Sequence, residues 1–269
     1  MNLNEIRNSY ILEGYVLLDA SNKTCQDVIL SKIAKSALSK NVTIKGGVII
    51  QQISKDKRRA TRDFDLDFIR YSLEDDSIKG FIEMLNEVND GVKISIVAPI
   101  EELNHQEYHG KRVILELCDQ QSTRIGTKLD IGVHSRLDIE QEEYCFVLDG
   151  IGENVALLMN SIEQMFAEKL TSLLKLGRFS TRYKDIFDFY FFINSGRLND
   201  DRLLDLFAEY IFNAQEMREV NISDIYKRLL SIFNNKAFLD RAGTAHSNWL
   251  EIPINDVTDR VLLFFKEHF

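Results

Sequence analysis

The sequence of 269 residues has little proline and no low-complexity stretch. Its two prolines, Pro99 and Pro253, lie far apart, and no segment is dominated by glycine, serine or another single residue. These absences argue against a flexible linker and against disorder. No repeat of about 20 to 50 residues is visible either. Because 45% of the residues are hydrophobic, we expect a substantial core in one large domain or two modest ones.

Signals for secretion and for membrane insertion are also missing. The N-terminal stretch "MNLNEIRNSY" has no basic region followed by an apolar core. No apolar run approaches the length that is needed to cross a bilayer. We therefore expect a cytoplasmic protein.

Cysteine is scarce, and its spacing does not indicate a metal site. The three cysteines are an odd number, and Cys118 and Cys145 lie in strand-like apolar runs, so we predict that they and Cys25 are buried, reduced thiols. His105 and His109 are four residues apart, but no nearby Cys/His pair completes a zinc site.

Positive charge is in the minority, since the net charge is −9. This balance argues against a protein whose whole surface grips nucleic acid, because that affinity comes largely from Lys and Arg contacts with phosphates. A local patch remains possible in "KDKRRATR", residues 55–62. The alternative is a solvated turn. The cations of this segment are Lys55, Lys57, Arg58, Arg59 and Arg62.

The hydrophobic pattern changes near residue 155. Before it, two helical stretches lead into short alternating or apolar runs that predict strands, interrupted by helix candidates at about 47–54 and 77–88. After it, the pattern predicts helices only. We therefore expect an α+β domain over 1–155 and an all-helical domain over 156–269, packed closely together. The predicted C-terminal helices are about 160–176, 183–194, 200–213, 222–233 and 255–268.

Three aspartates alternate with large apolar residues in "DFDLDF", residues 63–68. In a strand, Asp63, Asp65 and Asp67 share one face, and the apolar residues anchor the other face on a core. Neighbouring carboxylates resist ionisation together unless a positive charge lies between them, and Mg²⁺ is a hard ion that carboxylate oxygens bind. The alternative is an amphipathic edge strand with a wet acidic face.

Two further segments favour the metal site. In "KLDIGVH", Lys128, Asp130 and Gly132 share one face of a strand, so Asp130 is placed to meet the aspartate pair from a neighbouring strand. Two metal ions held in this way activate a hydroxyl and stabilise a pyrophosphate leaving group, which is phosphoryl or nucleotidyl transfer. Upstream, Gly46 and Gly47 join a strand to a helix start, where a phosphate can approach the backbone.

A lysine falls on the apolar stripe of the helix predicted at 160–176. Lys169 must extend to solvent or find an anion, either a nucleotide phosphate or a protein carboxylate. In the next helix, Asp185 and Asp188 share a face, and Asp188 needs a partner such as Arg182, Lys184 or Lys169. The residues leave open whether this is an ion pair that braces the helices or part of a site. Trp249 is predicted to anchor the last helix.

In this order, "KGG", "RATRDFD", "KLDI", "EQMFAEKL" and "RYKDIFDFY" resemble the AbiEii/AbiGii-type nucleotidyltransferase toxins of bacterial type IV abortive-infection toxin–antitoxin pairs. The resemblance spans residues 45 to 190. It implies a nucleotidyltransferase-fold mixed sheet with helices, followed by an all-helical C-terminal domain that closes the active-site cleft. It also implies Mg²⁺-dependent transfer of a nucleoside monophosphate from an NTP, with RNA or tRNA as the acceptor and an antitoxin encoded alongside.

The resemblance also implies roles for individual residues. Asp63, Asp65 and Asp130 correspond to the metal ligands, and Lys169 and Asp185 to the other catalytic residues. The nucleotide-binding set that it implies is Lys45, Gly46, Gly47, Arg59, Thr61, Lys169 and Asp188. Two other functions stay open: a small-molecule nucleotidyltransferase of the antibiotic-modifying type, and an inactive binding module that acts through a protein partner.

Overall fold

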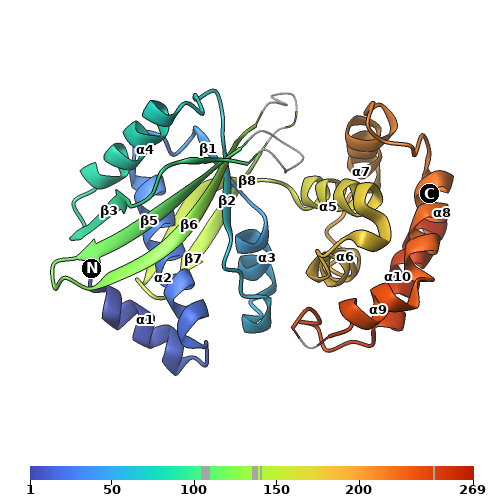
Figure 1. Cartoon of the computed structure of the whole chain (residues 1–269), viewed down its shortest axis with the longest axis horizontal. Coiled ribbons are helices and arrows are strands. Elements are labelled where there is room, and N and C mark those ends of the chain that lie inside the picture. The colour runs from blue at the N-terminus through green and yellow to red at the C-terminus, as the bar shows by residue number, and fades with distance from the viewer. Residues whose placement is uncertain (104–109, 135–138, 140, 245) are drawn as a thin grey trace. The chain divides into compact units, whose positions relative to one another are not determined.

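The computed structural model describes residues 1–103, 110–134, 139, 141–244 and 246–269, so His105 and His109 lie outside the described residues. The chain forms two compact units, Met1–Asn160 and Ser161–Phe269 (Figure 1). The first is a mixed sheet with helices and the second is helical, which confirms the predicted fold class. None of the helices within the described ranges combines the length and apolar character that crossing a membrane requires.

The sheet of the first unit has the strand order β3-β5-β6-β2-β1-β8-β7, and β4 pairs with β5 (Figure 1). The pairs β2–β6 and β1–β8 are parallel, and the other pairs are antiparallel. The strands are β1 Val42–Lys45, β2 Phe64–Phe68, β3 Val92–Ile96, β4 Glu101–Glu102, β5 Lys111–Asp119, β6 Arg124–Val133, β7 Glu142–Leu148 and β8 Glu153–Met159.

The helix α2 covers one face of this sheet. It packs on β6 and β8 and contacts α1 and α4. Thr127 of β6 lies 3.5 Å from Asn22 of α2, measured between Oγ1 and Oδ1, which identifies the face of β6 that α2 covers. The helices of the first unit are α1 Leu3–Leu12, α2 Leu17–Lys35, α3 Gly47–Ser54, the short η1 Lys57–Arg59 and α4 Asp75–Glu87.

Alternation along the strands sorts the side chains between the two faces of the sheet. Leu129 and Ile131 lie on the same face as Thr127, and they stand opposite Phe64 and Leu66 of β2 in the register. These four residues are buried and form the core beneath α2. The alternate residues, among them the aspartates of β2, therefore lie on the opposite face.

The sheet continues further along the chain than the sequence predicts. The change from strands to helices is expected near residue 155, whereas β8 ends at Met159 and the two units divide after Asn160. The segment "ENVALLM" contains Ala, Leu and Met, which favour helices. Pairing with β1 and β7 overrides this local preference.

The thiols differ in their surroundings. Cys25 is buried, and burial raises the pKa of its thiol to about 12, which confirms the predicted buried thiol at this position. Cys118 is half-buried, and Cys145 is exposed, so the prediction of burial is wrong for Cys145. Cys145 lies on β7, the edge strand of the sheet, and alternates with the buried Phe146.

The second unit is built around phenylalanine. The ring of Phe166 lies within 6.4 Å, centroid to centroid, of five other rings. These rings belong to Phe189, Phe192, Phe207, Phe264 and Phe265. The helices are α5 Ile162–Leu176, η2 Gly177–Phe179, α6 Lys184–Asn194, α7 Asp200–Phe207, the π-helical turn η3 Ala208–Phe212, α8 Ile222–Phe233, α9 Lys236–Ala242 and α10 Ile254–Glu267.

Phe166→Ala is expected to destabilise the helical unit by about 3–5 kcal/mol, because it leaves a cavity at the point where five other rings meet. Phe179→Ala is the matched control, since Phe179 is 76% exposed; its change is expected to stay within about 0.5 kcal/mol. Urea unfolding followed by circular dichroism measures both. Equal losses in the two variants would contradict the assignment of Phe166 as the centre of the core.

Candidate functional site

A row of charged residues crosses four neighbouring strands. Arg112 of β5 stands opposite Asp130 of β6, Asp130 stands opposite Asp65 of β2, and Asp65 stands opposite Lys45 of β1. Register partners on adjacent strands point to the same side of a sheet, so all four lie on the face opposite α2. The structure thus brings Asp65 and Asp130 together from separate strands. We call these four residues the charged row.

The end member Arg112 binds Asp130 through two parallel hydrogen bonds. Its Nε and Nη2 donate to the two carboxylate oxygens at 2.8 and 2.7 Å. These bonds raise the pKa of the Arg112 guanidinium above its already high usual value, so the group stays charged. Arg112 is not among the site residues that the sequence predicts. Its position on the polar face of a strand was a signal, but its partner depends on the register of the β5–β6 hairpin.

The other aspartates of β2 also pair with cations. Asp63, just before the strand and half-exposed, forms an ion pair with Lys128 of β6. Asp67 is buried, and its Oδ2 lies 2.9 Å from the Nζ of Lys45. Lys45 is predicted to bind nucleotide, but its ammonium group is held by the Asp67 carboxylate of the neighbouring strand.

The Gly-Gly turn approaches the acidic strand closely. Gly46 has a φ of +70°, and a Cβ at this position would lie 2.6 Å from Oδ2 of Asp65. Gly47 begins α3, and a Cβ there would lie 2.7 Å from Oγ1 of Thr61. Both contacts are shorter than side chains tolerate, so the absence of Cβ atoms lets the turn lie directly against the DxD segment.

The segment before Asp63 is held by its own hydrogen bonds. The Thr61 hydroxyl accepts from the Asp63 N–H at 3.3 Å, and the Thr61 carbonyl accepts from Gln26 of α2 at 3.0 Å. Arg59, predicted to bind nucleotide, is buried. Thr61 therefore fixes the entry of the chain into β2.

Two cations of the basic segment 55–62 are neutralised within the fold. Arg58 donates two side-chain hydrogen bonds to Asp56 at 3.1 and 2.8 Å, and Arg62 lies 3.0 Å from Asp19. These ion pairs leave the segment less suited to nucleic acid than its sequence indicates.

In the helical unit, Lys169 of α5 joins two aspartates of α6. Its Nζ binds Asp185 and lies 3.1 Å from Oδ2 of Asp188. Arg182 lies 3.0 Å from the other oxygen of Asp185, and the Trp249 indole donates to Asp188 at 3.1 Å. The two aspartates and the lysine are buried. The contacts are those of the bracing ion pair, one of the two interpretations that the sequence leaves open, and Trp249 anchors its segment to α6.

The oxygen donors of the charged face fit a hard divalent cation in type. Oδ1 of Asp67 is buried and accepts no hydrogen bond from the part of the chain that the structure describes. As the side chains are placed, however, no group of three or more His, Cys, Asp or Glu among the described residues is arranged to hold a metal ion. Metal binding at Asp63 and Asp130 therefore requires Lys128 and Arg112 to release them.

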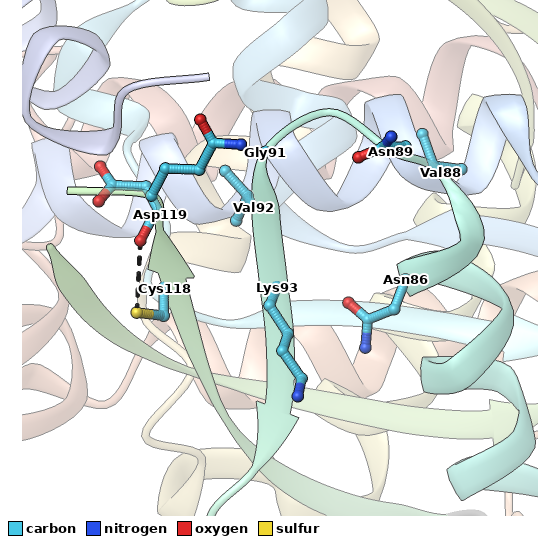
Figure 2. A pocket seen from close by; sticks show the side chains of 9 residues that line it. Asn86, Val88, Asn89, Gly91, Val92, Lys93, Cys118 and Asp119 are labelled. Atoms are coloured by element: carbon cyan, nitrogen blue, oxygen red, sulfur yellow. Dashed lines mark hydrogen bonds between the residues drawn. The ribbon is translucent and has the colours of Figure 1, made fainter. Parts of the chain in front are cut away.

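A pocket of about 510 Å³ lies away from the charged row, between the end of α4 and strands β3 and β5 (Figure 2). It is lined by Asn86, Lys93, Cys118 and Asp119, among others. Because Cys118 is six residues from Arg112 along β5, the two places are roughly 20 Å apart. Burial raises the pKa of the Asp119 carboxyl, but hydrogen bonds from the backbone of Leu3 and Thr123 outweigh it and lower the pKa overall.

A family model described as "Nucleotidyl transferase AbiEii toxin, Type IV TA system" matches residues 28–251. The matched range includes the Gly-Gly turn, the strands β2 and β6, and the Lys169 cluster with Asp185 and Asp188. No curated protein matches the chain.

Gly46→Ala is expected to destabilise the sheet unit more than Gly152→Ala does. Both glycines have a positive φ, of +70° and +66°, and Gly46 combines it with a ψ of −144°, a conformation essentially restricted to glycine, so Gly46→Ala loses about 1–3 kcal/mol to backbone strain alone. Only the Gly46 methyl meets Asp65, which adds about 1–3 kcal/mol, since nothing lies within 4 Å of a Cβ at Gly152. Chemical denaturation compares them, and indistinguishable losses would argue against the close approach.

Lys169→Met is expected to destabilise the helical unit by about 3–5 kcal/mol, because it leaves Asp188 buried without its cation. Lys79→Met serves as the control, since Lys79 pairs with Asp76 on the surface and its loss should have no measurable effect. Thermal unfolding of both variants provides the comparison. A Lys169→Met protein as stable as the wild type would mean that the cluster does not brace α5 and α6.

Proposed function

The chain belongs to the family of AbiEii nucleotidyltransferase toxins of type IV toxin–antitoxin systems, and from this premise we propose the reaction that it performs. We propose that it transfers a nucleoside monophosphate from an NTP to a hydroxyl group of RNA, with tRNA as the acceptor. The family implies an antitoxin as a partner. The observation that carries the proposal is the charged row, in which Asp65 lies opposite Asp130 and beside the Gly46 turn.

We propose that Asp63, Asp65 and Asp130 hold Mg²⁺. Four carboxylates lie on the charged face, those of Asp63, Asp65 and Asp130 and that of Asp67. A triphosphate placed beside it would be repelled unless further positive charge were supplied. Bound Mg²⁺ would supply that charge and polarise the α-phosphate. The residues that must then exchange partners are Lys128 and Arg112.

The triphosphate is proposed to lie against the Gly46–Gly47 turn. Without Cβ atoms the phosphate oxygens can approach the backbone, and the first N–H groups of α3 favour an anion. Lys45 and Thr61 are proposed to contact the triphosphate from the two sides of this turn. Lys45 precedes the turn on β1, and Thr61 packs against Gly47. Arg59 is proposed to support the same turn from its buried position.

Two roles are distinguished for the cluster of Lys169, Asp185 and Asp188. Their mutual contacts support a bracing role inside the helical unit. The nucleotide-binding and catalytic roles that the resemblance implies stay predictions.

One observation favours a non-catalytic alternative. Asp63, Asp67 and Asp130 are each paired with a cation of the sheet, an arrangement that is electrostatically stable without any bound ion. A binding module that acts only through a protein partner would need nothing more. A small-molecule nucleotidyltransferase is the remaining alternative, and it differs only in the acceptor.

To test the reaction, the purified protein is incubated with each labelled NTP, Mg²⁺ and total RNA. Wild type is expected to label RNA with at least one NTP. Asp65→Asn keeps the shape of the side chain and removes the charge that would hold Mg²⁺. It is expected to lower the labelling rate at least about 100-fold, which corresponds to a loss of about 2.7 kcal/mol of transition-state stabilisation. Asp76→Asn, on the exposed start of α4, is the control.

The proposed acceptor and the proposed enzymatic function can be contradicted separately. Label that appears in small molecules but not in RNA would favour the antibiotic-type alternative. Absence of label with every NTP, together with normal growth of cells that express the chain, would contradict an enzymatic function and favour the binding module.

A further inference from the structure

The loop between α5 and α6 displays an aromatic ring on the surface of the helical unit. Phe179 is 76% exposed, although phenylalanine rings form the core of this unit. Within the described part of the chain, the recorded contact of its ring is the guanidinium of Arg178, 5.0 Å from the ring centroid. Single exposed apolar side chains are common on protein surfaces, so the ring is informative only together with the charge and the loop geometry around it.

The loop is held in place at its beginning. Gly177 ends α5 with a φ of +55°, and its N–H donates to the Leu173 carbonyl. The Arg228 guanidinium of α8 packs against Gly177, where a Cβ would lie 2.6 Å from its Nη2, and donates to the Leu174 carbonyl at 3.3 Å. The exposure of Phe179 is therefore a property of a fixed loop.

The end of the loop is fixed as well. Ser180 is buried, and its N–H donates to the Gly177 carbonyl at 3.0 Å. The Ser180 hydroxyl accepts from the Arg182 N–H at 3.3 Å, and the Arg182 side chain is held by Asp185. The backbone that carries the ring is thus held at both ends, so binding costs little backbone entropy.

The segment that carries the ring is rich in cations. Residues 175–184 contain four cations and no acidic residue. Lys175 pairs with Glu216 and Arg182 with Asp185. For Arg178, no carboxylate among the described residues lies within 4 Å of its guanidinium, so its charge is available to an external anion. Arg58 and Arg62 of the basic segment 55–62, by contrast, are paired with Asp56 and Asp19.

We propose that Phe179 and Arg178 form a docking site for an unpaired nucleotide of the RNA acceptor. The base stacks on the Phe179 ring, and a neighbouring phosphate contacts Arg178. This inference rests on the proposed RNA acceptor. A protein interface requires a core of several desolvated apolar side chains, and this segment exposes two, Leu176 and Phe179. One ring beside one uncompensated cation suffices for a stacked base and its phosphate.

Binding of a labelled single-stranded oligoribonucleotide to the full chain tests the site by fluorescence anisotropy. Phe179→Ala is expected to weaken binding about 5- to 100-fold, the range for loss of one stacked base. Phe179→Trp should retain affinity, whereas Phe179→Leu, which keeps an apolar side chain without a ring face, should lose it. Leu204→Ala is the matched control, because Leu204 is an exposed apolar side chain on α7 of the same unit.

The contribution of Arg178 is read from the salt dependence. Arg178→Ala is expected to reduce the slope of log affinity against log salt concentration by about 0.7, the value for one phosphate contact on a single strand. Phe179→Ala should leave this slope nearly unchanged. An unchanged slope in Arg178→Ala would overturn the assignment of a phosphate to this residue.

The outcomes distinguish this inference from the proposed function. If wild type labels RNA and Phe179→Ala binds RNA equally well, the docking site is wrong and the reaction stands. If wild type neither binds nor labels RNA, the RNA acceptor and the docking site fail together. If Phe179→Ala loses self-association in sedimentation while RNA affinity is unchanged, the loop is a protein contact, which also overturns the inference.

Discussion

The parallel pairing of β2 with β6 is the constraint on which the site depends. It sets Asp65 opposite Asp130, and like charges directly opposite each other destabilise a sheet. The chain retains this pairing because the same register sets Phe64 opposite Leu129 and Leu66 opposite Ile131 under α2. A slip of one residue would move the aspartates into that core. Burial of the apolar face thus imposes the carboxylate pair on the other face.

The repulsion is offset by cations from the neighbouring strands. Lys45 and Arg112 occupy the two ends of the charged row, and Lys128 compensates Asp63 one pair further along β6. The pairing of β1 with β2 places Lys45, and the pairing of β5 with β6 places Arg112. The face is therefore charged, and the register of the sheet places its cations.

The sequence predicted the parts of the site that follow from periodicity. Alternation assigns Asp63, Asp65 and Asp130 to polar faces, and the position of Lys169 on an apolar stripe requires an anion for which Asp185 and Asp188 were candidates. It did not predict Arg112, because a partner across a hairpin depends on a register that the residues do not encode locally. It also overstated the charge of segment 55–62, since Asp19 is distant in sequence. β8 was missed because tertiary pairing overrides its helical composition.

The buried cluster in the helical unit connects to the exposed loop through a chain of contacts. A buried ion pair is weak evidence for stability, because desolvation offsets much of the attraction, so its value lies in fixing a geometry. Lys169 fixes Asp185, Asp185 holds Arg182, and Arg182 closes the loop that carries Phe179. Gly177 and Arg228 fix the other end. The interior charges of α5 and α6 thereby determine where one aromatic ring stands on the surface.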